Sequence, residues 1–287
     1  MSQRIILFAS TTFLALILSS CKPETSSVSG DVSQLEEKYL KNPSDSLFQD
    51  YLQALGREIR SADNGEEKEI WIEKAILALK APEQGNMKEI FQMESLKNNP
   101  GGEHAADYLW SLAEMKLVRN QMDEASLLFL GFKDRFPKDA RNRESEKYIF
   151  ASQRNRRAFL TSLDHDMVVA SDKGPDTLLT QQYIALSEAH SLGFPASAET
   201  PPFLFKAAGW ANALGNQAKA LQLYDWISTY YPGHPKAKES LMMKGFLLDT
   251  AFGRRDEAKQ VYSRFLEKYP KDSLADDAKY LLENLGK

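Results

Sequence analysis

The chain has 287 residues, of which 36 are Lys or Arg and 40 are Asp or Glu, so its formal net charge is −4. This slightly acidic balance argues against general binding to nucleic acid, which requires a basic surface to neutralise the phosphates. The single cysteine excludes a disulfide framework and any zinc or iron–sulfur site built from several cysteines. Hydrophobic residues make up 43% of the chain, which is typical of a folded globular protein.

The N-terminal segment has the pattern of a secretory signal peptide. Arg4 supplies a positive charge, and residues 5–18 (IILFASTTFLALIL) form an apolar run that is too short to cross a bilayer comfortably. A charged start, an apolar core and small residues before a cleavage site are typical of signal peptides. We therefore predict that residues 1–20 are a signal peptide and that residues 21–30, which are mostly polar, form a flexible tether.

The end of the apolar run, Leu18-Ser19-Ser20-Cys21, resembles the lipobox of bacterial lipoproteins. This resemblance implies that Cys21 becomes the mature N-terminus and carries lipid. One acyl chain anchors a protein only marginally, which is the physical reason for attaching more than one. Position 22 is Lys and not Asp, and by analogy with lipoprotein sorting in enteric bacteria this favours the outer membrane. The alternative is an ordinary secreted protein with one leftover cysteine.

Beyond residue 30 the pattern of apolar residues predicts helices. Apolar side chains recur at spacings of three and four, as in Leu47, Tyr51 and Leu55, which is the period of a helix buried on one face. Long alternating apolar and polar runs, which would predict strands, are nearly absent. We therefore predict an all-α fold for residues 31–287.

An internal repeat is the most informative feature of the sequence. The segments 123–140, 218–237 and 256–275 each contain a small anchor residue, an aromatic four residues later, a bulky apolar residue at seven, an aromatic at eleven and a proline at twelve. The first four positions share one helix face, and the proline ends the helix. We predict that the small anchors allow two helices to pack closely. The anchors are Ala125, Ala220 and Ala258, and the prolines are Pro137, Pro232 and Pro270.

These segments resemble the second helix of a tetratricopeptide repeat, a helical hairpin of roughly 34 residues. The resemblance implies a helical-hairpin solenoid, with clear repeats at 105–140 and 203–287 and divergent helical pairs elsewhere. Residues 141–200 lack the pattern, and we leave open whether they hold divergent repeats or an inserted helical pair. A generic helical bundle is the alternative fold. Residues 274–285 are predicted to form a terminal capping helix.

Residues 267–286 (EKYPKDSLADDAKYLLENLG) are similar to the C-terminal repeats of two bacterial families. One is the Tol-Pal–associated periplasmic coordinator family, and the other is the tetratricopeptide lipoprotein of the β-barrel assembly machine. The resemblances imply a scaffold or adaptor in the cell envelope that binds a protein partner in outer-membrane protein assembly, secretion or a Tol-Pal–like complex. The expected location is the outer membrane, through the lipid anchor and facing the periplasm, without binding to nucleic acid.

The first helix of each tetratricopeptide hairpin lines the concave side of the stack. By that geometry the predicted partner-binding residues are Trp110, Glu114, Phe205 and Asn212, although core packing is the alternative for the aromatic residues. The basic run at 141–157 is interpreted as a solvated helix face, with an acidic partner or lipid phosphates as the alternative.

The sequence predicts no catalytic residue, no metal site and no cofactor, because the common catalytic motifs are absent. The best local cluster, Asp164-His165-Asp166, is interpreted as a solvated turn. Two other functions remain open. One is a carbohydrate-binding outer-membrane lipoprotein of the kind that caps a nutrient transporter, and the other is a hydrolase built around His165 and distant carboxylates.

Overall fold

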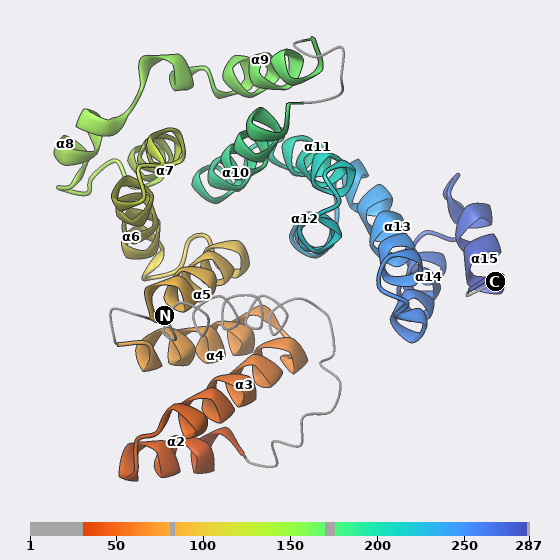
Figure 1. Cartoon of the computed structure of the whole chain (residues 1–287), viewed down its shortest axis with the longest axis horizontal. Coiled ribbons are helices and arrows are strands. Elements are labelled where there is room, and N and C mark those ends of the chain that lie inside the picture. The colour runs from red at the N-terminus through yellow and green to blue at the C-terminus, as the bar shows by residue number, and fades with distance from the viewer. Residues whose placement is uncertain (1–30, 81–83, 170–175, 286–287) are drawn as a thin grey trace. The chain divides into compact units, whose positions relative to one another are not determined.

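The computed structural model describes residues 31–80, 84–169 and 176–285 (Figure 1). Within these ranges every regular element is a helix and there is no β-strand, so the predicted all-α fold is confirmed. None of the helices in these ranges is long and apolar enough to span a membrane. The predicted signal peptide, the tether and Cys21 lie outside the described residues.

The chain divides into two units, Met1–Leu112 and Ala113–Lys287, and each is described by itself. In the first unit the helix at 32–41 packs against the helix at 45–61. That helix packs against the one at 65–78, which in turn packs against the one at 85–98. The helices of this unit are α2 (Val32–Lys41), α3 (Asp45–Ser61), α4 (Gly65–Ala78), α5 (Gly85–Asn98) and the first part of α6 (Ala105–Val118).

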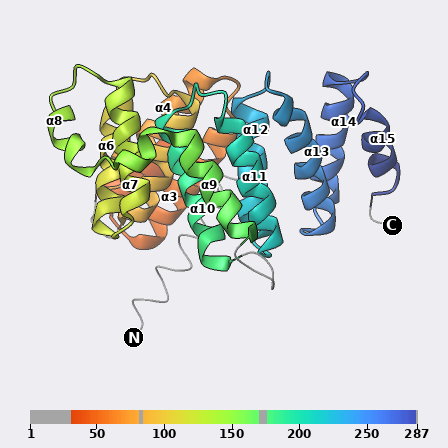
Figure 2. The ribbon, with the colours of Figure 1, turned by 90° about the horizontal axis from the view of Figure 1, so that it is seen from above.

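In the second unit the main helices pack in the order α7, α10, α11, α12, α13, α14 and α15, each against the next. A second layer of short elements and α9 connects α7 to α10, and α9 packs along α10 (Figure 2). The elements are α7 (Met122–Arg135), α8 (Asn142–Ser145), η2 (Glu146–Tyr148), η3 (Ala151–Arg154), α9 (Arg156–Val169), α10 (Thr177–Gly193), α11 (Thr200–Ala213), α12 (Gln217–Tyr230), α13 (Pro235–Thr250), α14 (Arg255–Lys268) and α15 (Ala275–Glu283).

Four helices of the second unit end in the same turn. In each, the backbone N–H of an aromatic residue donates to the carbonyl four residues earlier, and a proline follows. Since proline has no N–H to continue the ladder, the helix stops there. The bonds are Phe136 to Phe132 (2.8 Å), Phe194 to His190 (2.8 Å), Tyr231 to Ile227 (3.0 Å) and Tyr269 to Phe265 (2.8 Å).

The second of these turns shows what occupies residues 141–200. Helix α10 has the spacing of the other repeats, with Tyr183 at the anchor position, Ser187 at the fourth, His190 at the seventh and Phe194 at the eleventh, all of them buried. The large and small residues at the first two positions have exchanged places. The region therefore holds a divergent helical pair, α9 and α10. The loop that follows α10 runs from residue 194 to residue 199.

That loop ends at Thr200, where α11 begins. Pro201 and Pro202 lie in the first turn of α11. The first-turn N–H groups have no partner inside a helix, so proline is tolerated there and its fixed φ favours the helix. The two prolines therefore mark the start of the helix.

A close contact joins the last hairpin, α13 and α14. A Cβ atom added to Gly245 would lie 2.6 Å from Cε1 of Tyr262, whose ring is fully buried. We predict that Gly245→Ala lowers the free energy of unfolding by about 1–3 kcal/mol through overpacking. Urea unfolding of G245A, Y262L and the double variant would measure this. Shortening Tyr262 removes the clash, so the double variant is expected to lose less stability than the two single losses added together.

Candidate partner-binding surface

The three small anchors are fully buried, each with no exposed side-chain surface. Ala220 begins the buried face of α12, and Ala258 that of α14, on the helices that pack against α11 and α13. The prolines that close the same segments, Pro137, Pro232 and Pro270, are exposed. The repeats therefore bury the anchors and place the prolines at their outer turns.

The outward faces of α11 and α13 form the candidate partner-binding surface, which we call the helix-A surface. The two helices contact each other although α12 lies between them in the sequence. Each leaves open one face, with residues three and four apart that are exposed or half-buried. The helix-A surface consists of Lys206, Gly209 and Ala213 of α11 and Met243, Phe246 and Thr250 of α13.

Two equivalent positions at the middle of this surface have different sizes. Phe246 of α13 is a large hydrophobic residue whose side chain the fold leaves 42% exposed. Gly209 is exposed, and a Cβ atom added to it would meet no atom within 4 Å. An exposed bulky apolar group and an open, side-chain-free position on two helices that contact each other are suited to receive side chains from a partner helix or peptide.

The predicted residues Phe205 and Asn212 lie at the edge of this surface. The Phe205 ring packs edge-to-face on Tyr224 at a centroid distance of 5.5 Å, and Nζ of Lys236 lies 4.3 Å from its centroid. Asn212 is half-buried, and its carbonyl accepts a hydrogen bond from the N–H of Gly215. Phe205 therefore contributes to packing between repeats as well as to the rim of the surface.

The other two predicted residues, Trp110 and Glu114, lie one turn apart on α6. Trp110 is half-buried and Glu114 is exposed. Phe205 and Asn212 lie two turns apart on α11. The structure thus places each of these two pairs on one helix.

Helix α9 borders the helix-A surface through one carboxylate. Asp164 accepts hydrogen bonds from Nζ of Lys206 (2.5 Å) and from Nε1 of Trp210 (3.2 Å), and its side chain is 16% exposed. These two hydrogen bonds hold the side chains of Lys206 and Trp210 in place before a partner binds, which lowers the conformational entropy lost on binding. This contact could not be predicted from the sequence, because the residues are more than 40 positions apart.

The interpretation of Asp164-His165-Asp166 as a solvated turn was wrong, because these residues lie within α9 and only two of them are exposed. Asp164 is engaged by α11, while the side chains of His165 and Asp166 are 71% and 66% exposed. Across the ranges that the structure describes, no group of three or more His, Cys, Asp or Glu residues is placed to hold a metal ion.

The basic run at 141–157 is largely neutralised by local acids. Arg156 differs from the rest, since its guanidinium lies 3.8 Å from the centroid of the Phe194 ring. The run covers α8, η2, η3 and the start of α9, so it is not the face of a single helix as expected. The ion pairs are Arg141 with Asp139 (2.7 Å), Lys147 with Glu144 (2.5 Å), Arg154 with Glu146, and Arg157 with Glu199 (3.4 Å).

Residues 239–272 match the tetratricopeptide repeat family. The match covers α13, α14 and the proline turn that follows them, which are the elements that carry Phe246 and Ala258. No curated protein and no solved structure matches the chain with significance. The chain therefore contains a tetratricopeptide repeat in its last helical hairpin, and such repeats generally mediate binding between proteins and are typically not catalytic.

Proposed function

We propose that the protein is a membrane-tethered adaptor that binds a protein partner of a bacterial envelope complex through the helix-A surface. The observation that carries this proposal is that Phe246 and Gly209 are both exposed at equivalent positions of α13 and α11, the first helices of neighbouring hairpins, which contact each other. A preformed helical surface of this kind binds a peptide or helix without the entropic cost of ordering a flexible receptor.

The partner contact is expected to be mainly apolar at its centre and polar at its rim. Phe246 and Met243 supply the apolar part, while Lys206 is held at the edge by Asp164. Interfaces commonly have this arrangement, in which a few buried apolar anchors carry most of the binding energy. An amphipathic helix or extended peptide of an outer-membrane assembly, secretion or Tol-Pal–like component would fit such a surface.

The proposed anchor is lipid attached to Cys21, with the helical domain on the periplasmic side of the outer membrane. Support for it comes from the signal-peptide pattern and from Leu18-Ser19-Ser20-Cys21. Confining the adaptor to a membrane face would raise its effective concentration near membrane partners. We expect Cys21→Ser to move the protein from the membrane fraction to the soluble fraction and to abolish incorporation of labelled palmitate. A Cys21→Ser protein that stays membrane-bound would contradict the anchor and leave the helix-A proposal intact.

The partner surface is tested by charge insertion at Gly209. We expect Gly209→Arg to weaken partner binding at least tenfold, because a charged side chain would project into the apolar centre of the surface. The matched control is Thr229→Arg, at an exposed position of α12 outside the surface. A photo-crosslinker at position 246 should capture a defined envelope protein in cells of the native host. That adduct should disappear with Gly209→Arg and persist with Thr229→Arg; equal crosslinking with both variants would refute the proposed surface.

A further inference from the structure

Two proline turns of the second unit border an open cavity that the helix-A surface does not include. It has a volume of about 350 Å³ and lies between the turn that joins α10 to α11 and the turn that joins α12 to α13. Its walls are three prolines, two tyrosines, one histidine and small residues. The prolines are Pro195, Pro201 and Pro232, and the aromatic residues are Tyr230, Tyr231 and His234.

A tyrosine stands at the eleventh repeat position after both α12 and α14, but only the tyrosine after α14 bonds to the neighbouring proline turn. In the following pair of turns, the hydroxyl of Tyr269 donates to the carbonyl of Pro232 at 3.4 Å, so one proline turn is tied to its neighbour. Tyr231 occupies the equivalent position one repeat earlier. Within the described ranges its hydroxyl has no hydrogen-bond partner, and the cavity lies where the neighbouring contact would be.

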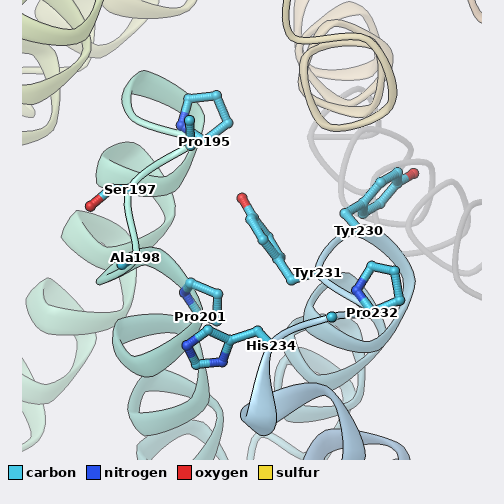
Figure 3. Close-up of a pocket in the computed structure, with 10 residues that line it drawn as sticks. Pro195, Ser197, Ala198, Pro201, Tyr230, Tyr231, Pro232 and His234 are labelled. Atoms are coloured by element: carbon cyan, nitrogen blue, oxygen red, sulfur yellow. The ribbon is translucent and has the colours of Figure 1, made fainter.

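Figure 3 shows how the lining residues are arranged. The Tyr231 ring stands between the two turns, with its hydroxyl directed toward the space between Pro195 and Tyr230. The imidazole of His234 lies beside Pro201, and its Nδ1 accepts a hydrogen bond from the N–H of Lys236 at 3.1 Å. Burial raises the pKa of Tyr231 to about 12, so its hydroxyl stays protonated and able to donate at neutral pH.

The chemistry of the lining restricts what the cavity can hold. None of its lining residues is Asp, Glu, Lys or Arg, so a charged ligand would lose hydration without gaining a countercharge. Flat proline and tyrosine faces favour an apolar ligand with flat surfaces. The free hydroxyl requires an acceptor, and the volume is at the lower end of the range for small-ligand sites.

A short polyproline II segment meets each of these requirements. It is uncharged, its proline rings pack on tyrosine faces, and its carbonyls have no internal hydrogen bonds and so remain free to accept. Its preformed shape also keeps the entropic cost of binding low, which is how aromatic-lined grooves recognise proline-rich peptides. We propose that the cavity between the proline turns binds a short proline-rich peptide, with a peptide carbonyl accepting a hydrogen bond from Tyr231. This site does not depend on the lipid anchor or on the helix-A surface.

The test uses the folded protein and two blocked peptides, tetraproline and tetraalanine. In ¹⁵N-labelled protein, tetraproline is expected to shift the amide signals of Ala196, Ala198 and Gly233, with binding in the high micromolar to millimolar range. Tyr231→Phe should weaken binding by about two- to tenfold, which corresponds to the loss of one hydrogen bond. The control, Tyr280→Phe, removes the hydroxyl of a tyrosine on α15 that is 66% exposed and does not line the cavity, and it should leave binding unchanged.

A second variant keeps the result interpretable if the loss in Tyr231→Phe is small. Ala198 is exposed at the rim of the cavity, so Ala198→Trp is expected to fill it and abolish the shifts without disturbing the buried core. Circular dichroism would verify that each variant keeps its helices. The proposal is overturned if tetraproline produces no shifts at these turns, if tetraalanine binds equally well, or if Tyr231→Phe and Ala198→Trp bind tetraproline as the unmodified protein does.

Discussion

Replacing Gly131 with alanine is expected to destabilise the second unit by about 3 kcal/mol, at the upper end of the usual cost of overpacking. Gly131 of α7 crosses Gly193 of α10, and a Cβ atom added to Gly131 would lie 2.4 Å from Cα and 2.7 Å from the carbonyl oxygen of Gly193. These are backbone atoms, so no side chain can rotate to relieve the clash. The two helices would have to separate along a contact that both bury.

Two other glycines provide graded controls for this prediction. A Cβ atom added to Gly193 would lie 3.2 Å from the carbonyl oxygen of Leu127 and 3.3 Å from Cα of Gly131, so Gly193→Ala should cost less than Gly131→Ala. Gly209 faces open space inside α11, and Gly209→Ala should stabilise the protein by about 0.5–1 kcal/mol, since glycine is unfavourable in a helix interior. Urea unfolding followed by circular dichroism would give the order. Equal stability of Gly131→Ala and the unmodified protein would show that α7 and α10 do not cross at these glycines.

The repeat spacing in the sequence was sufficient to predict the fold of the clear repeats. A helix face at positions 0, 4, 7 and 11 followed by proline specifies both which residues are buried and where the helix stops. The structure places Ala220, Tyr224 and Ile227 in the core and ends α12 at the predicted turn. In these repeats the residues that the helical spacing places on one face are the residues that pack against the neighbouring helices, so the sequence alone predicts the fold.

The sequence left open whether residues 141–200 hold divergent repeats or an inserted helical pair, because the residue at the anchor position was expected to be small. Tyr183 occupies that position in α10, and the small residue, Ser187, stands four residues later. The aromatic–proline step at Phe194 and Pro195 was a usable signal, since it ends α10 as the equivalent steps end α12 and α14. The Gly131–Gly193 contact gave no such signal, because it depends on a helix more than 60 residues away.

The predicted residues Phe205 and Asn212 lie one position before Lys206 and Ala213, which are exposed on α11. Successive residues of a helix are about 100° apart, so a shift of one residue turns a side chain from the open face to its edge. The turn after α13 also contains one more residue than the turn after α11. The N–H of Asn216 bonds the carbonyl of Ala211, five residues back, whereas that of Arg254 bonds Leu248, six residues back. The residues on the open face of a first helix therefore cannot be predicted by counting positions back through a turn of variable length.

Acid is expected to destabilise the second unit through His190, which stands at a position where the other repeats have Ile227 or Phe265. Its side chain is fully buried, between the rings of Phe194 and Phe203 at centroid distances of 5.3 and 5.2 Å. Burial and, secondarily, the charge of Arg156 lower the pKa of His190 from 6.5 to about 3. The folded protein therefore keeps the imidazole neutral at pH values where the unfolded chain protonates it.

The sign of the effect follows from that difference. The folded pKa lies below the unfolded one, so the stability is fully present above pH 6.5 and is lost as the pH falls toward 3. Each pH unit in this window costs about 1.4 kcal/mol, which amounts to about 3 kcal/mol by pH 4.5. Urea unfolding at pH 7.5, 5.5 and 4.5 would measure this loss, with other groups contributing their own share.

The variant His190→Leu isolates the contribution of the imidazole. It places an apolar residue where the other repeats have one, and Thr200 keeps a partner, because its hydroxyl donates to the carbonyl of Phe194 at 2.9 Å. Stability near pH 7.5 should change little, whereas the loss between pH 6.5 and 4.5 should shrink by about 3 kcal/mol relative to the unmodified protein. His165→Gln, at a side chain that is 71% exposed, should leave the pH dependence unchanged. If His190→Leu and the unmodified protein lose stability in parallel as the pH falls, His190 is not the group that makes this unit acid-sensitive.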